Sequence, residues 1–231
     1  MAWVRDGEHW MNRHAGIRAV AFDMDGVLID SHPAHRAAWR DFLLSLDRRV
    51  SDDELSFILE GRTRNEILRH FLGDLSEHEL TQYGKQKDEL FRSLEHGIEP
   101  LPGVIEFVRE LNRHGIVSAV ATSASEIRTF STIERLGLAE HFETIITASD
   151  VNRGKPDPMV YRVACERMGV PPEHALAFDD APAGIRAAAL AGMRCVGVSS
   201  NGLAPQLLQA GAECVIPDFV GLLLEEFTRT A

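Results

Sequence analysis

The fold of this 231-residue chain is decided by one stretch near its start, residues 18–27, RAVAFDMDGV. The first five residues form a short, mostly apolar run, as expected for a strand buried in a parallel sheet. The strand leads into an acidic turn at Asp23, and Gly26 allows the chain to turn sharply there. The sequence therefore predicts a buried strand that delivers Asp23 and Asp25 to one edge of a sheet.

Short apolar runs alternate with helical patterns through most of the chain. Further strands are expected at 116–121, 144–147, 175–178 and 195–198, with a sixth at an edge of the sheet at 213–216. Helical patterns lie between them at 104–114, 126–136, 158–168, 183–191 and 204–209. This alternation is typical of an α/β fold with a parallel sheet and crossover helices.

Residues 31–96 break the alternation. They carry only helical patterns, at 33–45, 52–59, 64–71 and 77–94. The segment 100–103, PLPG, fits a return hinge, because Pro and Gly end helices and fix turns. We therefore expect a core made of residues 1–30 and 97–231 and an inserted helical domain of residues 31–96.

Composition narrows the classes of partner. The formal net charge of −11 argues against nucleic acid or an anionic membrane, and no run reaches the roughly 18 apolar residues of a membrane span. Cys165, Cys195 and Cys214 lack metal-type or redox-type spacing and are expected to be reduced thiols in a cytoplasmic protein. Residues 1–16 lack the apolar core of a secretory signal, and we assign them no function. We expect a monomer or small homo-oligomer that binds a small anionic molecule.

Four predicted strands end in polar side chains. Because ligands gather at the carboxyl ends of parallel strands, these side chains are expected to lie together. One acidic turn alone would be weak evidence, since carboxylates are common in loops. The four groups are Asp23 with Asp25, Thr122 with Ser123, Lys155, and Asp179 with Asp180.

The two carboxylates of the first turn suit two different roles. Asp23 can attack phosphorus and form an aspartyl-phosphate, which splits one difficult displacement into two easier ones. Asp25 can protonate the leaving oxygen and then activate the attacking water. The competing interpretation is an ordinary solvated turn.

The other three groups suit metal and phosphate binding. Asp179 and Asp180 supply the hard oxygen ligands that Mg²⁺ prefers, although they could instead cap the next helix. The Thr122 hydroxyl and the Ser123 backbone amide offer hydrogen bonds to phosphate oxygens, and Lys155 offers a positive charge. A plain helix cap at Thr122 and a surface lysine at 155 are the alternatives.

Together these motifs resemble those of the haloacid dehalogenase superfamily. The resemblance covers about residues 17–200 and rests on residues 23–27 (DMDGV), Thr122, residues 154–157 (GKPD) and residues 179–184 (DDAPAG). It implies a Rossmann-like core, a helical cap inserted after the first motif, and magnesium-dependent phosphoryl transfer. The implied metal ligands are the Asp23 carboxylate, the Asp25 backbone carbonyl and Asp180, with Asp179 at or next to the metal; many relatives have Glu at the position of Asp179. Relatives that attack carbon–halogen bonds or cleave phosphonates lack the second Asp, so Asp25 favours an oxygen leaving group.

Residues of the inserted domain resemble those of sugar-phosphate phosphatases and β-phosphoglucomutases. In the mutases, the residue matching Arg64 binds the second phosphate, the one matching His35 couples cap closure to proton transfer, and the one matching Lys87 reaches toward the core phosphate. Glu60 stands where the mutase pattern has Lys, and a carboxylate there would repel a bisphosphate intermediate. Trp39 fits helix packing better than substrate stacking.

We therefore expect a magnesium-dependent phosphatase of sugar or polyol phosphates. A phosphomutase of the β-phosphoglucomutase type is the alternative, in which the acceptor is a sugar hydroxyl instead of water. A non-catalytic binding protein on the same fold is a third hypothesis, since a fold does not determine a function. The complete set of Asp23, Asp25, Thr122, Lys155 and Asp180 argues against the third.

Overall fold

The computed structural model describes residues 4–5, 16–59, 62–200 and 202–228. The chain divides into two compact units. Unit 1 comprises Met1–Ile29 and Pro100–Ala231, and unit 2 comprises Asp30–Glu99.

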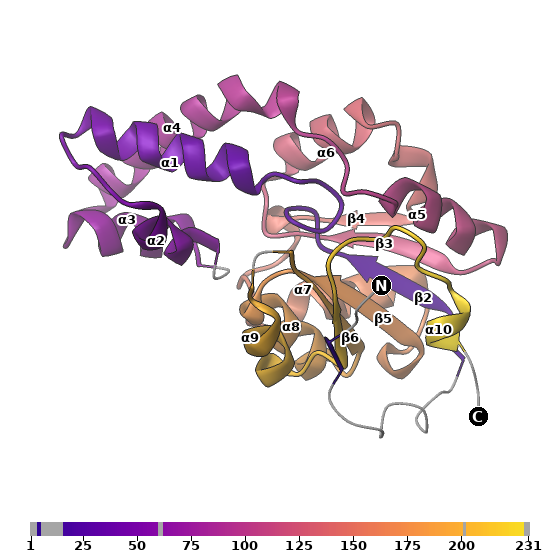
Figure 1. Cartoon of the computed structure of the whole chain (residues 1–231). Helices are drawn as coiled ribbons and strands as arrows, with labels where there is room; N and C mark the ends of the chain where they lie inside the picture. Colours follow the sequence, from indigo (N-terminus) through magenta and orange to yellow (C-terminus); the bar gives the residue numbers. More distant parts are fainter. Residues whose placement is uncertain (1–3, 6–15, 60–61, 201, 229–231) are drawn as a thin grey trace. The chain divides into compact units, whose positions relative to one another are not determined.

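Unit 1 is built on a seven-stranded sheet with the order β1-β7-β6-β5-β2-β3-β4 (Figure 1). Neighbouring strands from β7 to β4 are parallel, and only β1 pairs antiparallel, with β7. The α/β class and the parallel sheet expected from the sequence are therefore confirmed. The strands are β1 (Val4–Arg5), β2 (Ala19–Phe22), β3 (Val117–Ala121), β4 (Thr144–Ile146), β5 (Ala175–Asp179), β6 (Arg194–Val198) and β7 (Cys214–Ile216).

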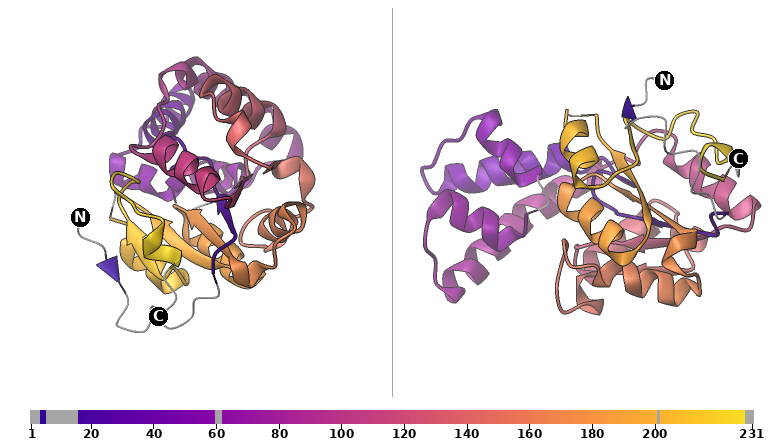
Figure 2. Two further views of the ribbon diagram at one scale, coloured as in Figure 1. Left: turned by 90° about the vertical axis from the view of Figure 1, so that its right-hand side faces the viewer. Right: turned by 90° about the horizontal axis from the view of Figure 1, so that it is seen from below.

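Helices cover both faces of this sheet (Figures 1 and 2). On one face lie α7 (Met159–Met168), α8 (Pro182–Ala191) and α9 (Ala204–Ala210), and on the other lies α5 (Val104–Arg113). The remaining helical elements of unit 1 are α6 (Glu126–Arg135), η4 (Ala139–His141), η5 (Ala148–Asp150), η6 (Pro172–His174) and α10 (Glu225–Thr228).

The two faces of the sheet are packed differently. Ala19 and Ala21 of β2 belong to a core cluster with Tyr161 of α7, so small side chains let this helix lie close to the strands. On the opposite face, Phe22 stacks on Phe178 of β5 with ring centroids 5.3 Å apart and meets Phe107 of α5 edge-on at 6.3 Å. Aromatic rings therefore fill the wider space under α5.

The strands have the predicted positions to within one or two residues, with one exception in topology. The strand predicted for residues 213–216 is not at an edge, because Val4 of β1 pairs with Val215 of β7. A two-residue strand has no recognisable pattern in the sequence, so β1 was not predicted. The rest of the N-terminal extension, residues 1–3 and 6–15, lies outside the described residues.

Unit 2 is helical in its described residues, with a core that includes Trp39, Phe42 and Leu68. Trp39 is 2% exposed, in agreement with a packing role. Its elements are α1 (His32–Ser45), α2 (Asp52–Leu55), η2 (Ser56–Leu59), α3 (Arg64–Leu72), α4 (Glu77–Leu94) and η3 (Glu95–Gly97). The sequence determines three of these helix starts directly, because α2, α3 and α4 each begin with a capping box.

The two chain crossings between the units lie next to each other. In unit 2, the Asp30 backbone N–H donates to the Glu99 carbonyl at 2.9 Å. In unit 1, Ile29 forms an antiparallel bridge with Pro100, and the Leu101 N–H donates to Leu28. The insertion therefore leaves and re-enters unit 1 at one place.

A membrane-spanning helix would need both length and an apolar surface. None of the helices in the described part of the chain combines the two.

Candidate active site

Asp23 and Asp179 lie side by side at the carboxyl edge of the sheet. Phe22 of β2 is in register with Phe178 of β5, and the Asp23 N–H donates to the Phe178 carbonyl at 2.9 Å. This bond extends the pairing of the two strands by one residue beyond β2. Asp23 therefore has a fixed backbone next to the last residue of β5.

Lys155 joins these two carboxylates. Its Nζ donates to Asp23 Oδ1 at 2.6 Å and to Asp179 Oδ2 at 2.8 Å. The Lys155 side chain is only 8% exposed, so this ammonium is largely removed from water. The loop after η5 thus returns to the edge predicted from the sequence.

The charges of this cluster shift its acid–base equilibria. Burial raises the pKa of Asp23 to about 8; Lys155 opposes this shift, and the carboxylates of Asp179, Asp180 and Asp25 add to it. Burial alone would lower the pKa of Lys155, but Asp179 and Asp23 outweigh it and raise that pKa above its ordinary value. The site therefore holds a positive charge beside a carboxyl group, that of Asp23, which is costly to ionise without a further cation.

Asp179 is tightly held by other parts of unit 1. The Tyr161 hydroxyl donates to its Oδ2 at 2.5 Å and the Ala181 N–H to its Oδ1 at 3.0 Å. Gly184 of α8 packs directly against it, since a Cβ at 184 would lie 1.9 Å from Asp179 Oδ2. Burial, followed by the charge of Asp179, raises the pKa of Tyr161 well above its ordinary range, so this hydroxyl stays protonated and donates. Asp179 is therefore fixed in orientation from three sides.

Asp25 is paired with Arg128 of α6. The guanidinium donates to both carboxylate oxygens, with Nη1 at 2.9 Å from Oδ2 and Nη2 on Oδ1. The turn that carries Asp25 is closed by the Gly26 N–H, which donates to Ile29 at 2.8 Å, and Gly26 has φ 75°. Asp25 is therefore oriented by a residue 103 positions away in the chain.

Thr122 and Ser123 follow β3, the neighbour of β2 in the sheet. The Thr122 N–H donates to Ile146 at 3.0 Å, and its hydroxyl accepts from the Ala124 N–H at 3.1 Å. Thr122 is buried and the Ser123 side chain is exposed. The sheet thus brings Thr122 to the same edge as Asp23, and its hydroxyl also caps the turn.

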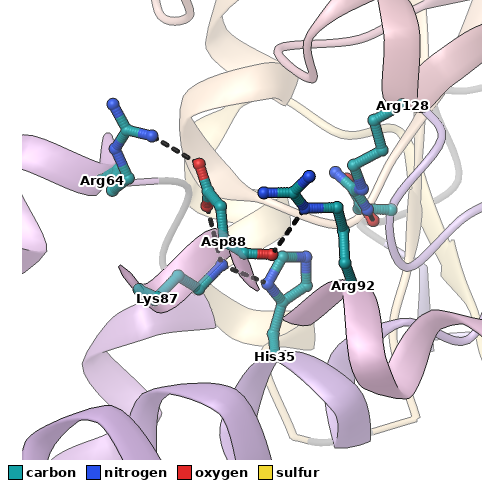
Figure 3. Close-up of polar contacts among 7 residues, drawn as sticks. His35, Arg64, Lys87, Asp88, Arg92 and Arg128 are labelled. Carbon is teal, nitrogen blue, oxygen red and sulfur yellow. Dashed lines mark hydrogen bonds and ion pairs between the residues drawn. The ribbon is translucent and has the colours of Figure 1, made fainter. Parts of the chain in front are cut away.

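Three predicted residues of unit 2 lie close to one another (Figure 3). Lys87 Nζ is 3.3 Å from His35 Nδ1 and 3.7 Å from Asp88 Oδ1, and Arg64 Nη1 donates to Asp88 Oδ2 at 2.5 Å. Lys87 also lies over the rings of Phe91 and Trp39. Glu60, on which the argument against a mutase rested, lies outside the described residues.

The oxygen donors of unit 1 suit a magnesium ion in type. Within the described ranges, no three His, Cys, Asp or Glu side chains converge to hold a metal unaided. Magnesium does not require such a cage, because it binds to one or two carboxylates and keeps water and phosphate as further ligands. Asp23 and Asp180, both buried, and the Asp25 backbone carbonyl are oxygen donors of the kind that magnesium prefers.

Arg128 and Tyr161 were not predicted from the sequence. Both lie on helices, and their partners depend on how α6 and α7 pack in unit 1. No short-range pattern marks either residue. Gly184 was part of the motif in residues 179–184, and its close contact with Asp179 explains why a side chain does not fit there.

Comparison with known proteins agrees with this geometry. A family model described as haloacid dehalogenase-like hydrolase matches residues 17–192. Hexitol phosphatase A of Escherichia coli (strain K12) is 31% identical over 209 residues, which are 90% of this chain and 92% of that protein. Fructose-1-phosphate phosphatase YqaB of the same strain is 34% identical over 191 residues, covering 80% and 97% of the two chains.

A solved structure of similar size has the same fold. The crystal structure of β-phosphoglucomutase from Clostridium difficile aligns with a TM-score of 0.78 at 26% identity, covering 91% of this chain and 95% of that one. The family model spans most of unit 1 and all of unit 2. The chain therefore belongs to the haloacid dehalogenase-like hydrolase family.

Proposed function

We propose that the protein is a magnesium-dependent phosphatase of small phosphorylated sugars or polyols that acts through an aspartyl-phosphate on Asp23. The observation that carries this proposal is the position of Lys155 Nζ, 2.6 Å from Asp23 and 2.8 Å from Asp179. An ammonium at that place stabilises the charge that develops on a transferring phosphoryl group. The substrate class is supported by two relatives whose names are hexitol phosphatase and fructose-1-phosphate phosphatase.

The metal would be held by Asp23, Asp180 and the Asp25 backbone carbonyl. When bound, the magnesium ion offsets the repulsion between the Asp23 carboxylate and a phosphate dianion. Asp179 accepts from Lys155, Tyr161 and Ala181, so we assign it mainly the task of positioning Lys155 next to the metal site. Because Lys155 engages Oδ1 of Asp23, Oδ2 is the oxygen that we assign to the attack.

Asp23 and Asp25 divide the chemistry. In the first half-reaction, Asp23 attacks phosphorus, the ester P–O bond breaks, and the Asp25 carboxyl gives a proton to the leaving oxygen. In the second, water attacks phosphorus, Asp25 takes a proton from it, and the bond from Asp23 to phosphorus breaks. The bidentate bond from Arg128 is the arrangement expected of ionised Asp25, the form that acts in the second half-reaction.

The remaining predicted residues are assigned to binding. The Thr122 hydroxyl and the backbone amides of Ser123 and Gly26 are the proposed donors to phosphate oxygens. His35, Arg64 and Lys87 of unit 2 are further residues that we propose to bind the substrate or its phosphate. Three buried cysteines that form no disulfide, Cys165, Cys195 and Cys214, support a cytoplasmic location.

A phosphomutase is the second candidate. It is favoured by the likeness to a solved β-phosphoglucomutase and by the position of Arg64 on the same unit as His35 and Lys87. The two activities differ in the acceptor, which is water in one and a sugar hydroxyl in the other. The complete set of Asp23, Lys155 and Asp179 contacts argues against a non-catalytic binding protein.

Product analysis separates these functions. The purified protein is incubated with magnesium and a panel of hexitol, fructose, glycerol and glycolate phosphates, with β-glucose 1-phosphate included, and both phosphate and glucose 6-phosphate are measured. Rapid phosphate release from one group is the expected result. Glucose 6-phosphate with little free phosphate would instead establish the mutase, and the absence of both products would favour the binding protein.

The covalent step has its own test. Asp23→Asn should abolish turnover with the fold intact, whereas Asp74→Asn, which removes an exposed carboxylate of unit 2, should leave turnover unchanged. Mass spectrometry of the quenched enzyme should show a phosphoryl group on Asp23. Turnover that survives in Asp23→Asn would rule out the aspartyl-phosphate.

A further inference from the structure

Asp88 of α4 lies among basic side chains of unit 2 (Figure 3). Its Oδ2 accepts from Arg64 Nη1 at 2.5 Å, and its Oδ1 is 3.7 Å from Lys87 Nζ. Its backbone carbonyl accepts from Arg92 Nε at 3.4 Å. A carboxylate therefore already occupies the place where these cations would attract an anion.

The backbone of α4 holds Arg64 at this carboxylate. Gly84 lies one helical turn before Asp88, and a Cβ there would come within 2.6 Å of the Arg64 Cζ and Nε. The missing side chain at 84 is thus what makes room for the guanidinium. Arg64 is seated over α4 next to Asp88, so their pairing follows from the shape of the helix surface.

Arg64 and Asp88 are much more exposed than Lys87. The side chains of Arg64 and Asp88 are 43% and 45% exposed, whereas that of Lys87 is 6% exposed, with its Nζ 4.9 Å from the centre of the Phe91 ring. A molecule that reaches this part of unit 2 therefore meets a guanidinium and a carboxylate together. Such a pair offers both donors and acceptors, which suits hydroxyl groups.

We propose that Asp88 is a specificity residue of unit 2 that makes the Arg64–Asp88 pair favour a hydroxyl group of the substrate over a second phosphate. A second phosphate has to displace Asp88 from Arg64 and is repelled by it, because both are anions. A polyol or sugar hydroxyl donates to Asp88 and accepts from Arg64 without breaking the pair. This inference rests on the proposed phosphatase function and narrows its substrates to monophosphates.

The test compares two substrates that differ by one phosphate, fructose 1-phosphate and fructose 1,6-bisphosphate. Initial-rate kcat/KM values are measured with magnesium for the wild type, Asp88→Asn and Asp88→Glu. Asp88→Asn keeps the size of the side chain and removes its charge, so it should raise the bisphosphate-to-monophosphate ratio by about tenfold. Asp88→Glu keeps the charge and should leave the ratio near that of the wild type.

Two further variants locate the effect. Glu89→Gln removes the same charge from the next residue of α4, which is exposed, and should not change the ratio. Gly84→Ala added to Asp88→Asn should cancel the gain, because the new Cβ displaces the Arg64 guanidinium. An unchanged ratio in Asp88→Asn, or an equal gain in Glu89→Gln, overturns the proposal.

A binding measurement keeps this inference separate from the proposed activity. The phosphatase proposal fails if no member of the wider panel releases phosphate, and whenever the wild type hydrolyses neither fructose compound the assignment of Asp88 is decided by ligand-induced shifts in Tm. The extra shift given by fructose 1,6-bisphosphate over fructose 1-phosphate should then be larger in Asp88→Asn than in the wild type. Equal extra shifts in the two proteins would overturn the role of Asp88 independently of turnover.

Discussion

Asp23 lies where an ionised carboxylate is poorly tolerated. It is 7% exposed, and its carboxylate neighbours outnumber the one ammonium that it contacts in the described structure. Such a group destabilises the fold in its charged state, and the charged state becomes favourable when a bound cation supplies compensating charge. Reactivity and stability are therefore opposed at this residue.

The unfavourable ionisation of Asp23 predicts an unusual pH dependence of stability for the metal-free protein. The pKa of Asp23 is raised from 3.8 to about 8, so between these pH values the unfolded chain has lost a proton that the native chain retains. The free energy of unfolding due to this group therefore falls as the pH rises from about 4 to about 8. In EDTA at pH 7, Asp23→Asn should exceed the wild type in Tm by about 3 °C or more, with the gap closing toward pH 4.

Differential scanning calorimetry at several pH values measures this gap directly. Magnesium should stabilise the wild type more than Asp23→Asn, because only the wild type has the full charge at position 23. A wild type that is as stable as the variant at pH 7 in EDTA would show that Asp23 is not strained by its surroundings.

In the proposed mechanism, Arg128 would act on catalysis through Asp25. It donates to both oxygens of that carboxylate, so Arg128→Ala should leave Asp25 free to rotate and lower kcat by about tenfold with little change in KM. Arg128→Lys, which keeps the positive charge but has a single donor nitrogen, should recover part of the loss. In an Asp25→Asn background, Arg128→Ala should have little further effect on kcat, and an undiminished effect there would contradict the positioning role.

At the residue scale, the sequence predicts the side chains whose positions depend only on strand ends. Asp23, Thr122 and Asp179 each come at or just after a strand, and parallel strands bring such positions to one edge. Arg128 and Tyr161 lie on helices, where 3.6-residue periodicity tells which face is buried but not which atom it meets. Their contacts depend on helix packing, which the sequence alone does not specify.

At the scale of elements, α8 is fitted to the end of β5. Gly184, in the first turn of α8, allows the helix to lie against the Asp179 carboxylate. The predicted alternation of apolar and helical segments locates both elements. The edge of the sheet was harder to predict. β7 pairs with β1, and a strand of two residues is too short to show a recognisable hydrophobic pattern in the sequence.

The contact between Gly184 and Asp179 predicts that a Gly-to-Ala substitution, which usually stabilises a helix, destabilises the protein at this position. Replacing Gly by Ala in a helix usually stabilises it by up to about 1 kcal/mol, but Gly184→Ala should cost about 2 kcal/mol because its Cβ displaces Asp179. Turnover should fall as well, since Lys155 then loses a partner. Gly84→Ala is the matched control, because its Cβ meets only the movable end of Arg64. Urea unfolding of the two variants measures the change in the free energy of unfolding, which should be a clear loss in Gly184→Ala and not in Gly84→Ala.

At the scale of the whole molecule, unit 1 contains a carboxyl group, Asp23, whose effect on stability changes with pH in the direction opposite to that of three glutamates of unit 2. The pKa values of Glu54, Glu66 and Glu79 are lowered, chiefly by hydrogen bonds from the N-cap residues Ser51, Thr63 and Ser76. A lowered pKa gives stability that is present above the ordinary value of 4.5 and is lost as the pH falls through the folded pKa. In unit 1 the pKa of Asp150 is also lowered, but that of Asp23 is raised.

Hydrogen exchange, corrected for the intrinsic rate at each pH, should separate the units. Lowering the pH from 5 to about 3.5 should speed the opening of α3 and α4 in unit 2. Raising it from 5 to about 8 in EDTA should instead speed the opening of β2 and β5, and magnesium should suppress that change. Equal changes in both units in each direction would contradict this division.

The adjacent crossings at Ile29–Asp30 and Glu99–Pro100 have a consequence for engineering and for evolution. Because the insertion begins and ends at paired backbone positions, exchanging it for another helical segment with neighbouring termini requires no change in the strands. Unit 1 then keeps Asp23, Lys155 and Asp179, while the new inserted segment contributes different side chains for substrate binding. One catalytic unit could in this way be combined with different inserted domains, and so with different substrates, by exchanging the insertion at these two adjacent crossings.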